Sequence, residues 1–179
     1  LADLYVQLRQ PDDCEKVLEQ MPSPQKKTAR MVAFRGRVEK LRGKHGGEKV
    51  ADIRRELNLA METGCGVFRE EASMQSTVQT IEQLKGRYPD IQTQDSSKVF
   101  NTEIVNALEL GNMLDVAEAV AVSAVARKES RGAHTRTDYE TRNDTDWLKH
   151  SLVRFAPDGP KLEYKPVTIT RWQPEERKY

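Results

Sequence analysis

Apolar residues recur at steps of three and four along much of the chain, which is the spacing of amphipathic helices. Glycine and proline interrupt this pattern at a few places and divide it into segments of helical length. We therefore predict four helices, over residues 23–42, 48–63, 70–88 and 100–130. The last segment is apolar on two faces between residues 112 and 125, and Gly111 is a point at which it could bend.

Three consecutive long helices joined by short loops favour an up-and-down three-helix bundle, like that of a spectrin repeat. We predict a mainly α fold in which residues 46–132 form this bundle. Residues 1–45 would be an N-terminal helical extension, with a short helical pattern at 1–10 and a helix that begins near Asp12 and ends at Pro22. The Gly-rich stretch 43–47 marks the boundary.

After Gly132 the helical pattern ends and the composition becomes polar. We predict that residues 133–179 form an ordered loop and short β-strands that pack on the bundle. Alternating residues on either side of an Asp-Gly turn indicate a C-terminal β-hairpin, with strands at 151–155 and 161–164. Residues 167–172 are a further strand candidate.

Gly132 predicts the end of the last helix, because glycine readily takes the left-handed conformation found there. Arg127, Lys128 and Arg131 would then lie in the final turns, where the helix dipole favours positive charge. Glu129 could form an ion pair with the arginines.

The overall charge excludes a general attraction to nucleic acid or to an anionic membrane, because 29 cations face 28 anions. No apolar run reaches membrane-spanning length, no signal sequence is visible, and Cys14 and Cys65 are too few for a disulfide framework. One helix has a basic surface, which we interpret as a solvated face or a face for an acidic partner. Its cations are Lys26, Lys27, Arg30, Arg35, Arg37, Lys40, Arg42 and Lys44.

Six short stretches carry a more specific signal. They are Met61–Arg69, Val99–Glu103, Ala126–His134, Arg142–His150, Leu162–Tyr164 and Glu176–Tyr179. Together they resemble the C-terminal region of the flavoprotein subunits of succinate dehydrogenase and fumarate reductase, with L-aspartate oxidase as a more distant relative. The chain departs from that family in a longer, more basic segment before residue 46. It also has Asn143 where aspartate is more usual, and we expect this second change to affect only a surface contact.

The resemblance implies a three-helix bundle that supports the FAD-binding domain of a longer subunit and docks an iron–sulfur subunit. The parent enzyme would interconvert succinate and fumarate and exchange electrons with a quinone. It would be cytoplasmic and peripheral at the inner face of the cell membrane, which it would reach only through partner subunits.

We expect no catalytic residue, no cofactor-binding residue and no metal ligand in this chain, because the family's flavin and dicarboxylate sites precede this region and no G-x-G-x-x-G fingerprint occurs. The isolated chain is expected to bind no FAD and to be inactive. The candidates for interdomain or partner docking are Arg127, Glu129, Ser130, Arg131, His134 and Trp147.

Three alternatives remain open from the residues alone. Ser130, His134 and Asp138 stand four residues apart and could form a hydrolase triad. A metal site is conceivable, with candidate ligands at His134, Asp138, Asp144, Asp146 and His150. The chain could also be an independent helical interaction module without redox function.

Overall fold

The computed structural model describes residues 23–156 and 159–175, and side chains from residue 29 onward. The predicted helical patterns at 1–10 and 12–22 lie outside these residues. The helices are α3 (Ser23–Leu41), α4 (Val50–Cys65), α5 (Glu71–Arg87), η1 (Tyr88–Asp90), α6 (Thr102–Ala126) and α7 (Asp144–Trp147). The strands are β1 (Glu48–Lys49), β2 (Phe68–Arg69), β3 (Ile91–Gln92), β4 (Thr135–Arg136), β5 (Lys149–Arg154) and β6 (Lys161–Pro166).

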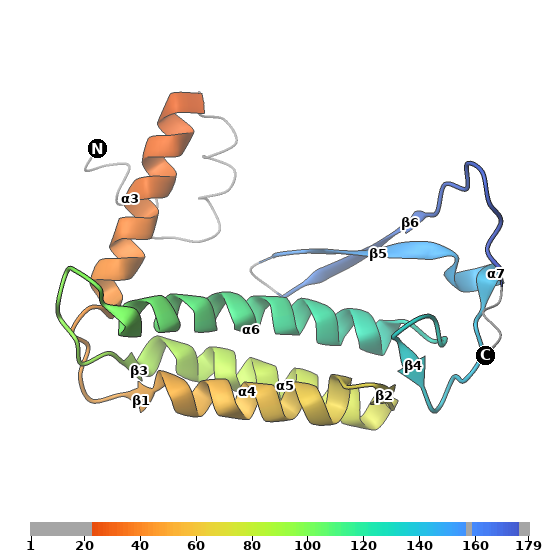
Figure 1. Cartoon of the computed structure of the whole chain (residues 1–179), viewed down its shortest axis with the longest axis horizontal. Helices are drawn as coiled ribbons and strands as arrows, with labels where there is room; N and C mark the ends of the chain where they lie inside the picture. Colours follow the sequence, from red (N-terminus) through yellow and green to blue (C-terminus); the bar gives the residue numbers. More distant parts are fainter. Residues whose placement is uncertain (1–22, 157–158, 176–179) are drawn as a thin grey trace.

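Helices α4, α5 and α6 pack side by side and run up, down and up, which confirms the predicted three-helix bundle (Figure 1). Each helix buries the apolar stripe that its sequence predicts. The core residues are Ile53, Leu57, Cys65, Met74, Ile81, Leu84, Ile91, Ala107, Leu110, Leu114, Ala117, Ala121 and Ala124. Among the described residues, no helix is long and apolar enough to cross a bilayer.

Helix α6 passes through Gly111 without a break, so no bend is needed there. A Cβ atom at Gly111 would lie 2.7 Å from the hydroxyl of Tyr88, which donates a hydrogen bond of 2.9 Å to the carbonyl of Ala107. The glycine therefore allows close packing of the Tyr88 ring against the helix. At the start of the helix, the Asn101 side chain accepts a hydrogen bond from the Ile104 N–H, as an N-cap should.

The predicted end of this helix was wrong. Helix α6 ends at Ala126, and Arg127 already has extended dihedral angles, φ −84° and ψ 106°. Gly132 does take the left-handed conformation, with φ 60°, but it lies in a turn between Arg131 and His134. Contacts of Arg127 with the hairpin replace the helical continuation, so the cations do not serve the helix dipole.

Two pairs of very short parallel strands close the ends of the bundle, and the sequence pattern did not predict them. Strand β1 pairs with β3 beside the start of α4, and β2 pairs with β4 beside the end of α6. A strand of two residues is too short to show an alternating sequence pattern, and the pairings depend on tertiary structure. The second pair is important because it ties the loop after α6 to the bundle.

The predicted hairpin is present as the antiparallel pair β5 and β6, with Lys149 opposite Pro166 and Arg154 opposite Lys161. It lies along one side of α6 (Figure 1). In the described part of the chain, residues 167–172 form no strand, so that prediction was wrong. Pro166 and Pro174 bracket a segment that instead runs as irregular chain.

The first described helix, α3, confirms the prediction for residues 23–42 and projects away from the bundle (Figure 1). Its cations Arg30, Arg35, Arg37 and Lys40 are exposed. Arg42 pairs with Glu39 at 2.8 Å, within the same surface. These four cations are therefore solvated, the side chains of Lys26 and Lys27 lie outside the described part, and the boundary at residue 46 stays a prediction.

Candidate functional site

The loop after α6 is built around the buried carboxylate of Glu129, of which only 1% is exposed. Arg127 forms an ion pair with it, and Arg131 donates from Nε and Nη2 at 2.9 and 3.0 Å. The backbone N–H of Asn143 donates a further hydrogen bond of 2.9 Å. Burial alone would raise the pKa of Glu129, but the hydrogen bonds from Arg131 and Asn143 outweigh it and the pKa is lowered.

The network continues from Arg131 to Asp144 at 2.5 Å, and from Asp144 to Arg142 at 2.7 Å. Asn143 caps α7, because its side chain accepts a hydrogen bond of 3.0 Å from the Asp146 N–H. Asn143 is thus an N-cap and a donor to Glu129. Both side-chain contacts of Asn143 are exposed, and its bond to Glu129 comes from the backbone, so the structure agrees with the expectation that this departure from the family affects only a surface contact.

Arg127 connects the end of α6 to the base of the hairpin. Its guanidinium donates to the carbonyl of Trp147 at 3.1 Å and to that of Lys149, and it lies 5.3 Å from the centre of the Trp147 ring. The Trp147 ring meets Tyr164 edge to face at 5.6 Å, and Lys149 Nζ lies 4.4 and 4.3 Å from the two ring centres. These stacked groups anchor the hairpin beside the helix.

His134 joins three segments that are far apart in the sequence. Its Nδ1 lies 2.8 Å from Arg69 Nη1, and its Nε2 lies 3.1 Å from the carbonyl oxygen of Arg127. A guanidinium can only donate, so Nδ1 accepts and the proton resides on Nε2. This requires the neutral imidazole, and burial lowers the pKa of His134 in agreement.

Arg136 is the largest fully buried side chain described, and the sequence analysis missed it. Its guanidinium donates to Asp138 at 2.7 Å, to Glu71 at 3.1 Å and to the carbonyl of Val125 at 3.0 Å. Hydrogen bonding to Arg136 lowers the pKa of Asp138 to about 2. The only sequence signal was an arginine two residues before an aspartate, which is common in exposed loops.

Ser130, His134 and Asp138 do not form a triad. The Ser130 hydroxyl donates to the Tyr139 carbonyl at 2.7 Å and accepts from the Arg136 N–H at 2.8 Å. His134 is bound to Arg69 and Arg127, and Asp138 is bound to Arg136. The geometry therefore gives no support to the hydrolase alternative.

The candidate metal ligands are also separated. In residues 23–156 and 159–175, no three side chains of histidine, cysteine, aspartate or glutamate gather as a metal site would require. Asp138 and Asp144 are instead neutralised by arginines, and Asp146 accepts from the side chain of Asn143 at 2.9 Å.

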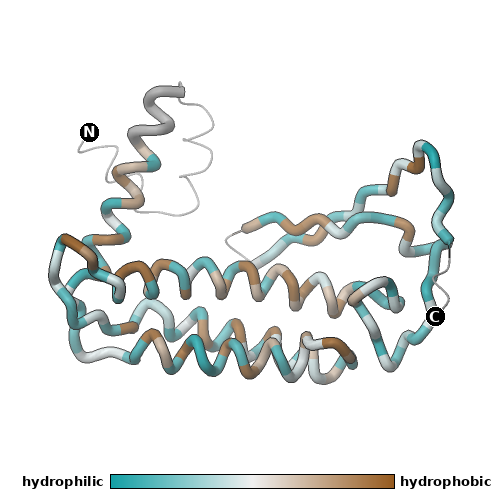
Figure 2. The backbone as a smooth tube through the Cα atoms, viewed as in Figure 1, coloured by the Kyte–Doolittle hydropathy of each residue, from teal (hydrophilic) through white to brown (hydrophobic). Residues whose placement is uncertain are grey.

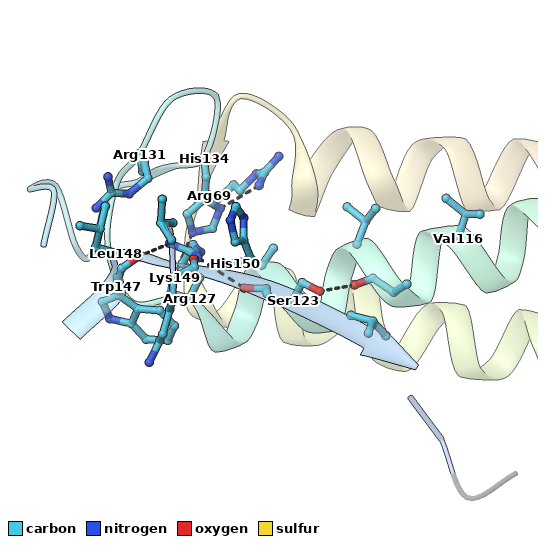
Figure 3. Close-up of a pocket in the computed structure, with 16 residues that line it drawn as sticks. Arg69, Val116, Ser123, Arg127, Arg131, His134, Trp147, Leu148, Lys149 and His150 are labelled. Carbon is cyan, nitrogen blue, oxygen red and sulfur yellow. Dashed lines mark hydrogen bonds between the residues drawn. The ribbon is translucent and has the colours of Figure 1, made fainter. Parts of the chain in front are cut away.

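Two open grooves flank α6, one on either side of the ridge formed by Val116 and Val120. The hairpin groove, between α6 and β5, has a volume of about 750 Å³ (Figure 3). The bundle groove, between α4 and α6, has a volume of about 490 Å³ and is lined mainly by apolar residues, among them Leu57, Met61 and Met113. Figure 2 shows apolar residues along the length of α6, in agreement with two apolar faces.

The hairpin groove collects most of the predicted docking residues. Arg127, Arg131, His134 and Trp147 all line it (Figure 3). Glu129 lies buried behind these residues, and Ser130 holds the adjoining loop. The arrangement holds the loop after α6 and the base of the hairpin in place beside the groove.

Residues 54–179 match the family model described as fumarate reductase flavoprotein C-term. The fumarate reductase flavoprotein subunit of Haemophilus influenzae is 49% identical over 144 residues, which are 80% of this chain and 24% of that protein. The E. coli subunit is 44% identical over 154 residues, 84% of this chain and 26% of that protein. The succinate dehydrogenase flavoprotein subunit of Rickettsia felis is 41% identical over 151 residues, 83% of this chain and 25% of that protein. The chain thus spans about a quarter of the length of these curated relatives.

Solved structures show the same fold. A structure of E. coli quinol fumarate reductase with a mutation in FrdA superposes with a TM-score of 0.79 at 40% identity, covering 88% of this chain and 28% of that one. The Mycobacterium smegmatis Sdh1 complex gives 0.69 at 27% identity, covering 80% and 25%. Because the family match covers most of the sequence and the three curated relatives are 41% to 49% identical, the chain belongs to the family of fumarate reductase flavoprotein C-terminal regions, which includes the matching region of succinate dehydrogenase flavoproteins.

Proposed function

We propose that this chain is the C-terminal helical domain of the flavoprotein subunit of a fumarate reductase or succinate dehydrogenase. It supports the FAD-containing catalytic domain of that subunit and helps to dock an iron–sulfur subunit. The parent reaction is the interconversion of succinate and fumarate, coupled to a quinone, and the chain reaches the membrane only through partner subunits. The observation that carries this proposal is the uncovered second apolar face of α6 in a chain that spans a quarter of its relatives' length.

That face is unusual for a helix in a small bundle. Val105, Val116 and Val120 are 53%, 63% and 42% exposed, although the opposite side of α6 is fully packed. A helix that is apolar on two faces is typical of an element covered on both sides. Covering one exposed valine contributes about 1.5 kcal/mol or more to association. We propose that the remainder of the flavoprotein subunit covers this face of α6.

We propose that the buried charge network positions the docking face, in place of the docking role predicted for it from the sequence. The donors of Arg127 and Arg131 bind Glu129, Asp144 and hairpin carbonyls within the chain. We propose that they keep the hairpin and the loop after α6 rigid beside the docking face, and do not themselves reach across the boundary. Trp147, Ser130 and His134 serve the same positioning role.

The described residues do not fit a flavin site. The lining residues of the grooves beside α6 include no glycine-rich turn at a helix N-terminus to hold a pyrophosphate, and Arg127 and Arg131 of the hairpin groove are bound by carboxylates and carbonyls of the chain itself. We therefore propose that FAD binds to the part of the subunit outside this chain.

The test uses the full-length flavoprotein subunit with Val116→Asp and Val120→Asp together. We expect a clear loss of bound flavin and of assembly with the iron–sulfur subunit, because two carboxylates would be buried at the interface. The matched control is Gln79→Asp with Gln83→Asp, which adds the same charge to an exposed part of α5. Equal flavin content and assembly in both double variants would contradict the proposal.

A further inference from the structure

The β5–β6 hairpin leaves one backbone edge open beside the hairpin groove. The Val167 N–H donates to the Leu148 carbonyl at 3.3 Å, so these two opposite residues form a hydrogen-bonded pair of the antiparallel ladder. Such pairs alternate along an antiparallel ladder. With the observed register, His150, Leu152 and Arg154 also bond to β6.

The residues between them present their backbone groups on the other edge of β5. These residues are Lys149, Ser151 and Val153, and all three line the hairpin groove. The Lys149 carbonyl is already bound by Arg127, which shows that this edge faces the end of α6. Within the described part of the chain, the backbone groups of Ser151 and Val153 are therefore the free part of the edge. A hairpin of two strands is marginal by itself, and a third strand stabilises it.

The groove has the length of a short strand. Its apolar floor extends from Val116 to the end of α6 near Arg127 (Figure 3). Eleven residues of helix cover about 16 Å at about 1.5 Å per residue. An extended segment of about five residues spans the same distance at about 3.3 Å per residue. Apolar side chains on one face of such a strand would rest on the valines.

The charge of the groove favours carboxylates in that strand, because Lys149 and Arg69 line the groove together with the α6 valines. No aspartate or glutamate lines the groove. Arg127 and Arg131 are neutralised by Glu129 and Asp144, but Arg69 and Lys149 have no carboxylate within 4.0 Å among the described residues. Two uncompensated cations beside an apolar floor complement a segment in which carboxylates alternate with apolar residues.

We propose that the hairpin groove takes an extended, acidic and apolar segment of the same flavoprotein subunit, which adds to β5 as a third strand. This inference rests on the proposed function, because the segment belongs to the three quarters of the relatives' length that this chain does not span. The segment bonds to the backbone of Ser151 and Val153, and its carboxylates face Arg69 and Lys149.

Amide hydrogen exchange tests the source of the segment. The Ser151 and Val153 amides should exchange fast in this chain and slowly in the full-length subunit without partners, because only the latter supplies the third strand. Protection that appears only after an iron–sulfur subunit is added would overturn the proposal. Protection of this chain that rises with its own concentration would also overturn it, because it would show that a second copy of the chain occupies the edge. Fast exchange in a subunit that still holds flavin would contradict the inference and leave the proposed function intact.

A peptide probe tests the chemistry. In this chain with Trp172→Phe, Trp147 is the single tryptophan and lines the groove. A six-residue peptide that alternates valine with glutamate should change its fluorescence saturably, whereas a peptide that alternates valine with lysine should not. Equal binding of the two peptides would overturn the charge argument.

A proline scan tests strand addition. Val153→Pro removes an N–H on the open edge, so it should weaken binding of the acidic peptide about fivefold to tenfold while the hairpin stays intact. Leu152→Pro is the matched control, because it removes an N–H that faces β6 and should disrupt the hairpin itself. Unchanged binding in Val153→Pro with an intact hairpin would contradict strand addition.

Discussion

Individual residues of the loop after α6 act through hydrogen bonds that sequence spacing does not reveal. Arg127, Glu129 and Arg131 form the ion-paired group that the sequence predicts, since arginines favour such buried pairs. The sequence did not point to Arg136, and it could not show that His134 binds Arg69, 65 residues away. Long-range partners depend on the β2–β4 pairing, which only the folded chain creates.

Removal of the charge at Glu129 should be costly. In Glu129→Gln, Arg127 and Arg131 lose a buried anionic partner, so we expect the free energy of unfolding to fall by about 2 kcal/mol, below the cost for a fully buried pair because both arginines are partly exposed. Denaturant unfolding measures this. Glu140→Gln, at an exposed position, is the control and should change stability by less than about 0.5 kcal/mol.

The neutral state of His134 should make stability depend on pH. Because burial lowers the pKa of His134 in the folded chain, only the unfolded chain binds a proton readily near pH 6. The contribution of His134 is therefore complete above about pH 6.5, and it is lost as the pH falls towards the folded pKa. The pKa values of Glu129 and Asp138 are lowered, so their contributions to stability are complete above about pH 4.5 and decrease only below it.

Melting temperatures at pH 7.5 and 5.5 measure this effect. The difference should shrink in His134→Asn, where the amide oxygen can still accept from Arg69 but no group titrates. His150→Asn, at an exposed position, should keep the full difference. If the pH dependence survives His134→Asn unchanged, another group causes it.

At the scale of elements, the sequence predicts the structures that depend on the spacing of apolar residues and on the positions of glycine and proline. The bundle helices and the hairpin follow from apolar stripes and from interruptions by glycine and proline, and these helices and the two strands of the hairpin are present. The end of α6 was misplaced by four residues, because the preference of Gly132 for the left-handed conformation fits a tight turn as well as a helix end. Tertiary contacts of Arg127 decided between the two.

Two glycines in helices should respond to alanine in opposite ways. Gly111→Ala should reduce stability by about 1 kcal/mol or more, because the new Cβ would displace Tyr88 and break its bond to Ala107. Gly86→Ala should increase it by about 0.5 to 1 kcal/mol, because no atom lies within 4 Å of its Cβ position and alanine favours helix. Thermal unfolding of the two variants measures both effects, and a stabilising Gly111→Ala would contradict the packing argument.

At the scale of the whole molecule, the chain is a helical bundle with a packed core and one exposed apolar face on α6. The family was predictable from six short stretches, and the match over residues 54–179 confirms it. The two apolar faces of α6 were also visible in the sequence. The position of the hairpin, and thus the groove between it and α6, was not, because it depends on the Arg127, Trp147 and Lys149 contacts.

The central claim is that the remainder of the flavoprotein subunit covers the Val116–Val120 ridge of α6. Maleimide labelling of Val116→Cys, located by mass spectrometry, tests it most directly, with Gln79→Cys on exposed α5 as the control. We predict that Cys at position 116 is labelled in this chain and protected in the full-length subunit, while Cys at position 79 is labelled in both. Equal labelling of position 116 in the chain and in the full-length subunit would contradict the account.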